Sequence, residues 1–313
     1  MNASTRLAIE TSGLTKRYGD VLAVNAIDLE IPAGQFFGLL GPNGAGKTSA
    51  IHMLSTLLKP TAGHARVAGY DVHGDKLAIR RRIGVVFQEL ALDRTLSVSE
   101  NLRFAGRLNG LSAAEIASRG GELLEIFDLA GKRNTPVAAL SGGMRRALDI
   151  ARGLIHQPEI LFLDEPTIGL DLPSRRAIWR HIAQLRAARG VTVFLTTHYL
   201  EEAADCDDVA FLSAGLVKLR GDPRTLVGNL GKYVVEIETD TPEELLARLT
   251  PRLGEAIVEP DRLQYVCDHE PADLAALQAE IAASVRAVRW RRPNLNDVFL
   301  WVNRPSIARR KAA

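Results

Sequence analysis

Residues 41–48 read Gly-Pro-Asn-Gly-Ala-Gly-Lys-Thr, and this stretch decides the fold class of the 313-residue chain. It fits the pattern G-x-x-x-x-G-K-[ST], in which glycines let the backbone come close to phosphate oxygens and successive N–H groups surround the β-phosphate. Lys47 of this pattern reaches the β and γ oxygens, and the Thr48 hydroxyl suits Mg²⁺. The sequence therefore predicts a polyphosphate site.

The surroundings of the loop agree with this interpretation. The apolar run 36–40 predicts a buried strand that enters the loop, and residues 49–58 predict the helix that leaves it. From Glu159 onward, strands at 160–163, 191–197 and 209–212 alternate with helices, which indicates a parallel sheet covered on both faces. Ligands of such sheets bind beyond the carboxyl ends of the strands.

Polar residues follow three of the predicted strands. Asp164 and Glu165 come directly after the apolar run 160–163, Gln88 follows 85–87, and His198 follows 191–197. An isolated acidic pair is usually a solvated strand end, but beside a phosphate loop Asp164 predicts a Mg²⁺ ligand and Glu165 a general base that polarises water. The Gln88 amide is able to touch the metal and the attacking water.

A second glycine-containing loop reads Leu140-Ser141-Gly142-Gly143 and opens a helix that runs to residue 155. A serine hydroxyl and a helix N-terminus predict a second anion site. Because this loop belongs to a separate helical block, it cannot easily fold onto the first loop of its own chain. A second copy of the chain is therefore expected to complete the site.

The order of these motifs, with Gly169-Leu170-Asp171 between the acidic pair and His198, resembles the ATP-binding subunit of ATP-binding cassette (ABC) transporters over about residues 6–228. Met144 in place of the usual glutamine, Ile168 before Gly-Leu-Asp, and the closing run 294–300 resemble the daunorubicin/doxorubicin-resistance type. Relatives of that type power export through a separate permease.

The resemblance assigns a role to each motif. It implies that Tyr18 stacks on adenine, that the Gln88 loop couples the nucleotide to the permease, and that His198 meets the γ-phosphate. It also implies contacts to the ATP of the opposite subunit from Ser141, Gly142, Gly143 and Asp171. The predicted sites comprise catalytic Lys47, Gln88, Glu165 and His198; Mg²⁺ ligands Thr48, Gln88 and Asp164; and ATP contacts Tyr18, Gly41, Pro42, Asn43, Gly44, Ala45, Gly46, Lys47, Thr48 and Ser49.

The predicted fold class is α/β, a P-loop NTPase cassette with a RecA-like core, an antiparallel β subdomain and an α-helical subdomain. The cassette is expected at 1–228, with its helical subdomain at about 89–155. Residues 229–303 follow as a C-terminal α+β domain whose βαββαβ order suggests a ferredoxin-like sandwich. A short basic tail is expected at 304–313.

Composition sets limits on the partners. With 46% hydrophobic and 24% charged residues and a net charge of +2, the chain is expected to be a globular protein without a nucleic-acid partner. The two cysteines, Cys206 and Cys267, have no metal-ligand spacing and favour a reducing compartment. No apolar run is long enough to cross a bilayer, so a separate permease chain and a peripheral place on the cytoplasmic face of the membrane are expected.

Two alternatives stay open at this point. One is a soluble cassette ATPase that acts on nucleic acid or ribosomes, although the zinc cysteines, long insertion or tandem cassette typical of such proteins are not seen in this sequence. The other is an importer motor with a regulatory C-terminal domain. The transported substrate is not written in this subunit, and drugs, lipids, polysaccharides and ions all remain open.

Overall fold

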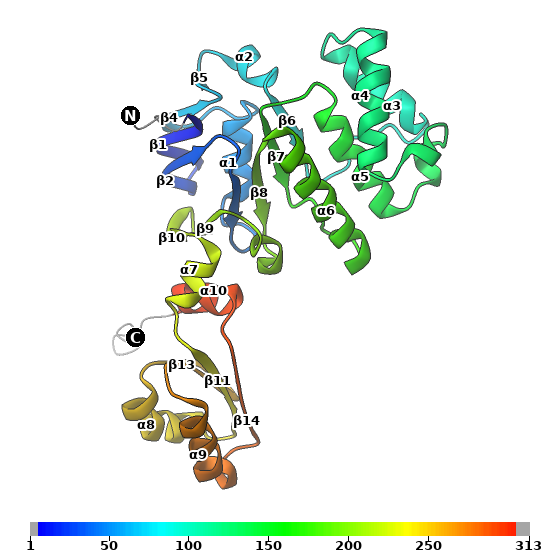
Figure 1. Ribbon diagram of the computed structural model, residues 1–313. Helices are drawn as coiled ribbons and strands as arrows, with labels where there is room; N and C mark the ends of the chain where they lie inside the picture. The colour runs from blue at the N-terminus through cyan, green and yellow to red at the C-terminus, as the bar shows by residue number, and fades with distance from the viewer. Residues whose placement is uncertain (1–5, 305–313) are drawn as a thin grey trace, which may run out of the picture. The chain divides into compact units, whose positions relative to one another are not determined.

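The computed structural model describes residues 6–304, and these form two compact units (Figure 1). The first comprises the chain up to Tyr199 together with Cys206–Val217. The second comprises Leu200–Asp205 together with the chain from Lys218 onward. Apart from Arg304, the predicted basic tail lies outside the described residues.

A six-stranded sheet forms the centre of the first unit, in the order β10-β9-β3-β8-β7-β6. The strands that run parallel are β6 (Ile83–Val86), β7 (Ile160–Asp164), β8 (Thr192–Thr197), β3 (Phe36–Leu40) and β9 (Asp208–Ser213). Every residue of β3, β7 and β8 is buried. Continuous apolar runs are typical of strands that are covered on both faces, so this part of the predicted fold class is confirmed.

An antiparallel sheet packs beside the parallel one. Its strand order is β2 (Val21–Pro32), β1 (Leu7–Tyr18), β4 (Ala62–Val67) and β5 (Tyr70–Asp71). One buried apolar cluster contains Ile9 of β1, Ile51 of helix α1 (Lys47–Leu54) and Phe162 of β7. The phosphate-loop helix is therefore held between the two sheets.

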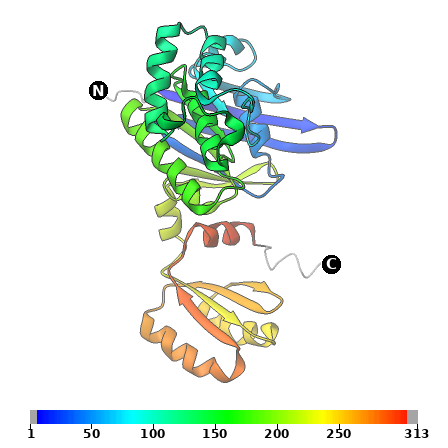
Figure 2. The ribbon, with the colours of Figure 1, turned by 90° about the vertical axis from the view of Figure 1, so that its right-hand side faces the viewer.

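Three helices make up most of the region predicted as the helical subdomain: α3 (Val98–Leu108), α4 (Ala113–Ile126) and α5 (Gly142–Leu154) (Figure 2). Capping boxes begin α3 and α4, since the Ser97 and Ser112 hydroxyls each accept the N–H of the glutamate three residues on. Three shorter helices of the first unit are α2 (Lys76–Arg80), η1 (Ala130–Lys132) and η2 (Val137–Ala139). Helix α6 (Leu172–Arg189) follows β7. Within residues 6–304, no helix has both the length and the apolar character needed to span a membrane.

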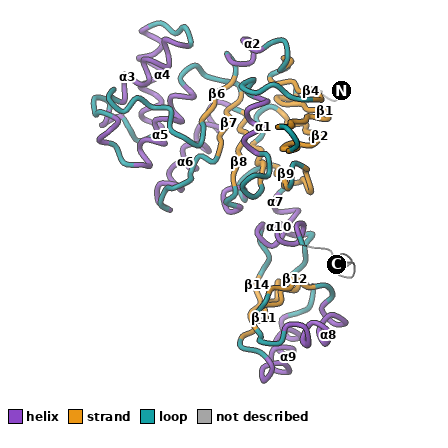
Figure 3. Tube along the Cα trace, turned by 180° about the vertical axis from the view of Figure 1, so that it is seen from behind, coloured by secondary structure: helices purple, strands orange, loops and turns teal. Residues whose placement is uncertain are grey.

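The second unit contains the βαββαβ order predicted for it. Strands β11 (Tyr233–Glu238), β12 (Ala256–Glu259), β13 (Arg262–Cys267) and β14 (Ala287–Arg291) form an antiparallel sheet in the order β12-β13-β11-β14. Helices α8 (Pro242–Leu253) and α9 (Pro271–Ile281), followed by η4 (Ala282–Ser284), lie on the same side of this sheet (Figure 3). Leu249 and Leu277 from these helices share an apolar core with Tyr265 of β13.

The second unit takes in more chain than the predicted range 229–303. It also includes η3 (Leu200–Ala203), the end of β10 (Leu216–Gly221) and α7 (Pro223–Gly228), because α10 (Leu295–Asn303) packs on both α7 and η3. Thr241 occupies the N-cap position of α8, but its side chain makes no capping hydrogen bond. Its backbone, at φ −127° and ψ 63°, departs from the extended conformation typical of an N-cap.

Asp297 anchors α10 inside the second unit. Its side chain is 1% exposed and accepts hydrogen bonds from both Nη1 and Nη2 of Arg291, at 2.7 and 2.8 Å, and from Nε2 of Gln264 at 2.9 Å. It also accepts the N–H of Asn294 at 2.8 Å, which closes a capping box at the start of the helix. One buried carboxylate thus links α10 to β13 and β14.

We predict that Asp297→Ala destabilises the second unit by about 3 kcal/mol. This value is the lower end of the range for breaking a buried ion pair, and it applies because Arg291 remains partly solvated. Asp261→Ala is the control, since its pair with Arg286 is exposed and worth about 0–1 kcal/mol. Urea denaturation would measure the difference, with hydrogen exchange of β11 and β14 as the local readout. Equal effects of the two variants would contradict the anchoring role.

Candidate nucleotide site

The phosphate loop joins the end of β3 to the start of α1, and its glycines are required by geometry. Gly46 has φ 109°, a region that residues with a side chain rarely adopt, and a Cβ there would lie 2.1 Å from the Ala23 carbonyl oxygen. A Cβ on Gly41 would lie 2.2 Å from the Leu212 carbonyl oxygen. The loop can therefore take this course only with glycine at both ends.

Lys47 is the buried cation of the site. Its side chain is 4% exposed, and Nζ lies 2.9 Å from the Gly41 carbonyl oxygen, 3.1 Å from that of Pro42 and 3.1 Å from Oε1 of Glu165. An ammonium group has three N–H donors, so these three oxygens satisfy it. The charge is held at the centre of the loop, where the pattern requires it.

Asp164, at the last position of β7, accepts hydrogen bonds from two hydroxyl groups. It is 2% exposed, and its Oδ1 accepts hydrogen bonds from Thr48 at 3.3 Å and from Thr196 of β8. A carboxylate beside the Thr48 hydroxyl is a set of hard oxygen donors that fits Mg²⁺. The predicted pairing of Thr48 with Asp164 is therefore present in the geometry.

Glu165 is held in an unusual backbone conformation. Its φ is 47°, which is uncommon for a residue other than glycine, and its N–H donates to the Thr196 carbonyl at 3.0 Å. Its two carboxylate oxygens are divided between Lys47 and Nδ1 of His198, the latter at 3.0 Å. The structure thus brings together three of the predicted catalytic residues, Lys47, Glu165 and His198.

A cavity of about 430 Å³ opens over the loop. Gln88 and Glu165 line it opposite the phosphate loop, and the other lining residues are Ala23, Asn43, Gly44, Gly46, Lys47, Thr48, Ser49 and Ile168. Tyr18, 47% exposed, lies beside the cavity with its hydroxyl 3.3 Å from that of Ser49. Most of the predicted ATP contacts therefore surround one cavity.

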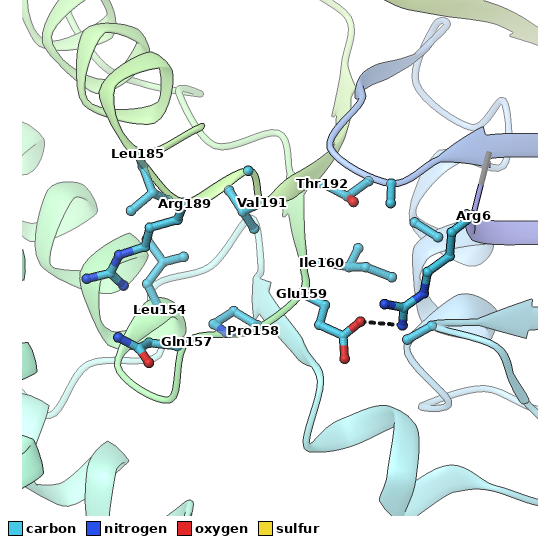
Figure 4. A pocket seen from close by; sticks show the side chains of 14 residues that line it. Arg6, Leu154, Gln157, Pro158, Glu159, Ile160, Leu185, Arg189, Val191 and Thr192 are labelled. Atoms are coloured by element: carbon cyan, nitrogen blue, oxygen red, sulfur yellow. Dashed lines mark hydrogen bonds and ion pairs between the residues drawn. The ribbon is translucent and has the colours of Figure 1, made fainter. Parts of the chain in front are cut away.

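A second cavity, of about 490 Å³, lies where β7 and β8 begin (Figure 4). An ion pair between Arg6 and Glu159, with 2.7 Å between Nη2 and Oε2, lies at its side. Among residues 6–304, those that line it include none of the predicted site residues. Its volume is similar to that of the cavity over the phosphate loop, but the predicted catalytic residues lie at the opposite ends of the strands.

The second predicted anion loop forms a separate surface of the first unit. Ser141 is exposed and caps α5 by accepting the N–H of Met144 at 3.2 Å. Asp171 caps α6 by accepting the N–H of Ser174, and hydrogen bonding from the Ser174 side chain and backbone keeps the pKa of Asp171 below its usual range. An ideal Cβ on Gly142 would lie 3.7 Å from the Leu170 side chain, so the two caps are neighbours. Within the described chain, neither cap lines the phosphate-loop cavity.

Reasoning from the sequence missed three residues that shape the site. Thr196 bonds Asp164 and positions Glu165, and its place at the end of an apolar strand was a usable signal. Ala23 lines the cavity from the antiparallel sheet, and Arg146 donates to the Phe87 and Gln88 carbonyls at 2.7 Å each. Neither of these two has a local sequence signal, because each acts across a tertiary contact.

Comparison with known proteins agrees with this geometry. Residues 24–168 match the family model described as ABC transporter. The chain is 41% identical to the daunorubicin/doxorubicin resistance ATP-binding protein DrrA of Streptomyces peucetius, with 96% of this chain and 93% of the relative covered. It is also 41% identical to the Nod factor export ATP-binding protein I of Ralstonia nicotianae, with 93% and 92% covered.

Solved structures show the same fold. The chain is similar to cbiO1 from Clostridium perfringens, part of the ABC transporter complex cbiONQ, with a TM-score of 0.67, 26% identity, and coverage of 79% of this chain and 96% of that one. It is also similar to the dimeric bacterial ABC transporter cassette MJ0796, with a TM-score of 0.63, 30% identity, and coverage of 68% and 98%. The ATP-binding cassette architecture predicted from the sequence is thereby confirmed. With this family likeness over nearly its whole length and a phosphate loop, acidic strand end and histidine at one edge of the sheet, the chain belongs to the ATP-binding, ATP-hydrolysing subunits of ABC transporters, of the daunorubicin/doxorubicin-resistance type.

Proposed function

We propose that this ATPase is the motor of an exporter: it dimerises on ATP and drives a separate permease in the membrane. The observation that carries the proposal is the separation of two functional surfaces on one chain. Lys47, Asp164 and Glu165 meet around the phosphate loop, whereas Ser141 and Asp171 cap neighbouring helices away from that cavity. A chain built in this way supplies half of each of two shared sites.

Hydrolysis starts with an exchange of partners at Lys47. The γ-phosphate competes with Glu165 for the ammonium group, since both are oxygen anions and Nζ has only three donors. Once released from Lys47, the Glu165 carboxylate is free to orient and deprotonate the attacking water, while His198 holds its other oxygen. Glu165 therefore stays paired with Lys47 until ATP is bound.

Thr48, Asp164 and Gln88 would hold Mg²⁺, which would supply positive charge to neutralise the charge that develops on the phosphate oxygens. Asp164 suits this role because it is the only carboxylate of the three and already accepts the Thr48 hydroxyl. Thr196 orients the same carboxylate from the neighbouring strand. Tyr18, beside Ser49 at the edge of the cavity, would stack on adenine.

Closure of the dimer would bring Ser141, Gly142 and Gly143 of one copy to the ATP on the Gly41 loop of the other. The N-terminus of α5 offers unpaired backbone N–H groups and positive potential to that phosphate. Asp171 would lie across the same interface. The dimeric cassettes among similar solved structures support this part of the proposal.

Export and membrane attachment rest on the named relatives. DrrA is a daunorubicin/doxorubicin resistance protein and the second relative is a Nod factor export protein, so outward transport of a drug-like or lipid- or saccharide-bearing substrate is the function we propose. The ATPase would then sit at the cytoplasmic face of the membrane, bound to a permease encoded as another chain. Substrate selection would belong to that permease.

We predict that Lys47→Ala lowers kcat/KM for ATP by at least about 100-fold, because the group that meets the β- and γ-phosphates is lost. Lys76→Ala, an exposed lysine on α2, is the matched control and should hydrolyse ATP as the unmodified chain does. Phosphate release from purified protein is the measurement. Near-normal turnover in Lys47→Ala would remove the proposed site.

Glu165→Gln is expected to bind ATP at least as tightly as the unmodified chain, since a neutral amide competes less strongly than a carboxylate for Lys47, yet to hydrolyse it about 10²–10⁴-fold more slowly. The ATP-bound variant should therefore accumulate as a dimer. Light scattering coupled to size-exclusion chromatography, with and without Mg²⁺-ATP, reports the mass. A variant that stays monomeric while loaded with ATP argues against the shared site.

Tyr18→Ala should weaken ATP binding by roughly 1–3 kcal/mol if the aromatic ring stacks on adenine. Tyr18→Phe is the control that keeps the ring and loses only the hydroxyl near Ser49. Titration with a fluorescent ATP analogue measures both. Similar losses in the two variants would show that the hydroxyl matters and the ring does not.

A further inference from the structure

Helix α5 carries a buried pair of opposite charges that the proposed mechanism does not use. Arg146 is 3% exposed and Asp149 is 0% exposed, and Nη1 of the arginine lies 3.5 Å from Oδ2 of the aspartate. Burying two charges costs several kcal/mol per ion unless their hydrogen bonds compensate, so a pair at this depth needs an explanation. The hydrogen-bond partners of these two side chains supply that explanation.

The arginine of the pair reaches the segment that carries Gln88. Arg146 donates from Nη1 to the Phe87 carbonyl and from Nη2 to the Gln88 carbonyl, each at 2.7 Å. Burial raises the pKa of Asp149, while the charges of Arg152 and Arg146 oppose that rise. Arg146, paired with Asp149, therefore holds the backbone of residues 87 and 88.

Asp149 is in turn fixed within its own helix. Arg152 lies on the side away from Arg146 and donates from Nε to Oδ1 at 3.0 Å, with Nη2 at 2.9 Å from the same oxygen. The carboxylate is thus braced between two arginines of one helix. Its orientation is thus set within α5, and its ion pair adds to the two carbonyls that orient Arg146.

The contacted segment links the two halves of the machinery. Gln88 lines the phosphate-loop cavity, whereas α5 begins at the Ser141 cap, only five residues before Arg146, or about 7.5 Å along a helix. Burial lowers the pKa of Arg146, and the charges of Asp149 and Asp164 oppose that lowering. No other side chain described here is shown to touch both the Gln88 backbone and the Ser141 helix.

We propose that Arg146 and Asp149 form a positioning pair that clamps residues 87 and 88 to α5, so that Gln88 in one ATP site and Ser141 at the other move as one body. This rests on the proposed function. A shift of Gln88 toward bound ATP then carries the Ser141 loop with it. The ATP bound beside Gln88 thereby changes the position from which Ser141 meets the second ATP. Neither residue touches ATP, so their effect is exerted through Gln88.

Arg146→Met tests the clamp with two independent readouts. We expect kcat for ATP hydrolysis to fall about 10- to 100-fold, as is typical when a catalytic group is displaced by about 1 Å, with KM within about threefold. Gln88→Ala should show a fall of the same order, and the double variant should be no slower than Gln88→Ala alone. Multiplying effects in the double variant would overturn the proposal.

Hydrogen exchange gives the readout that needs no activity. In Arg146→Met the amides of residues 84–86, the end of β6 that pairs with β7 beside the clamp, should exchange at least tenfold faster than in the unmodified chain, while those of α4 and the middle of α5 keep their protection. Arg119→Met, which removes an arginine from the surface pair with Glu115, is the control and should change neither readout. Unchanged exchange at residues 84–86 in Arg146→Met would also overturn the clamp.

The variant Arg146→Met with Asp149→Leu guards against simple unfolding, because it leaves no unpaired buried charge. It should fold and show the same loss of kcat and of protection as Arg146→Met. A pair that only stabilises the fold would instead give normal kinetics in this variant. If the unmodified chain itself fails to hydrolyse ATP, the proposed function falls, while the exchange experiment still judges the clamp.

Discussion

A buried ammonium group is the constraint around which the rest of the site is arranged. Lys47 is almost inaccessible to solvent, and a cation there is tolerated only because oxygens surround it. Two of these oxygens are backbone carbonyls of the loop itself, and the third belongs to Glu165 at the end of β7. The loop, the helix α1 and the strand β7 must therefore keep fixed relative positions, or the charge is left without partners.

The register of the parallel sheet makes those positions possible. Leu40 at the end of β3 pairs with Thr197, and Asp164 at the end of β7 pairs with Thr196, so three strands end at nearly the same level. The residue that follows each strand end then reaches the same space: the phosphate loop, Glu165 and His198. Positive φ at Glu165 turns its side chain away from the strand direction, a local strain that the hydrogen bonds to Thr196 help to maintain.

The parts of this structure that were predictable from the sequence are those with local causes. The phosphate loop, the apolar strands that precede Asp164 and His198, and the capping boxes at Ser97 and Ser112 each depend on residues a few positions apart. The roles of Thr196 and Arg146 depend on partners 32 and 58 or 59 residues away, and no short motif encodes such a pairing. The same holds for the limits of the second unit, since Leu200–Asp205 joins it through packing on α10 rather than through composition.

The two glycines after Ser141 belong to one motif, but a different structural reason accounts for each of them. A Cβ on Gly143 would lie 2.5 Å from the Ser174 hydroxyl, so packing against the start of α6 is reason enough for glycine there. Gly142 is different, because a Cβ would meet nothing nearer than the Leu170 side chain at 3.7 Å, and its φ is not in the left-handed region. Packing and backbone conformation within the chain thus leave room for a side chain at Gly142. Close approach of an external group to the N-terminus of α5 would account for glycine at this position, and a phosphate held by a second copy is the group that the proposed dimer supplies.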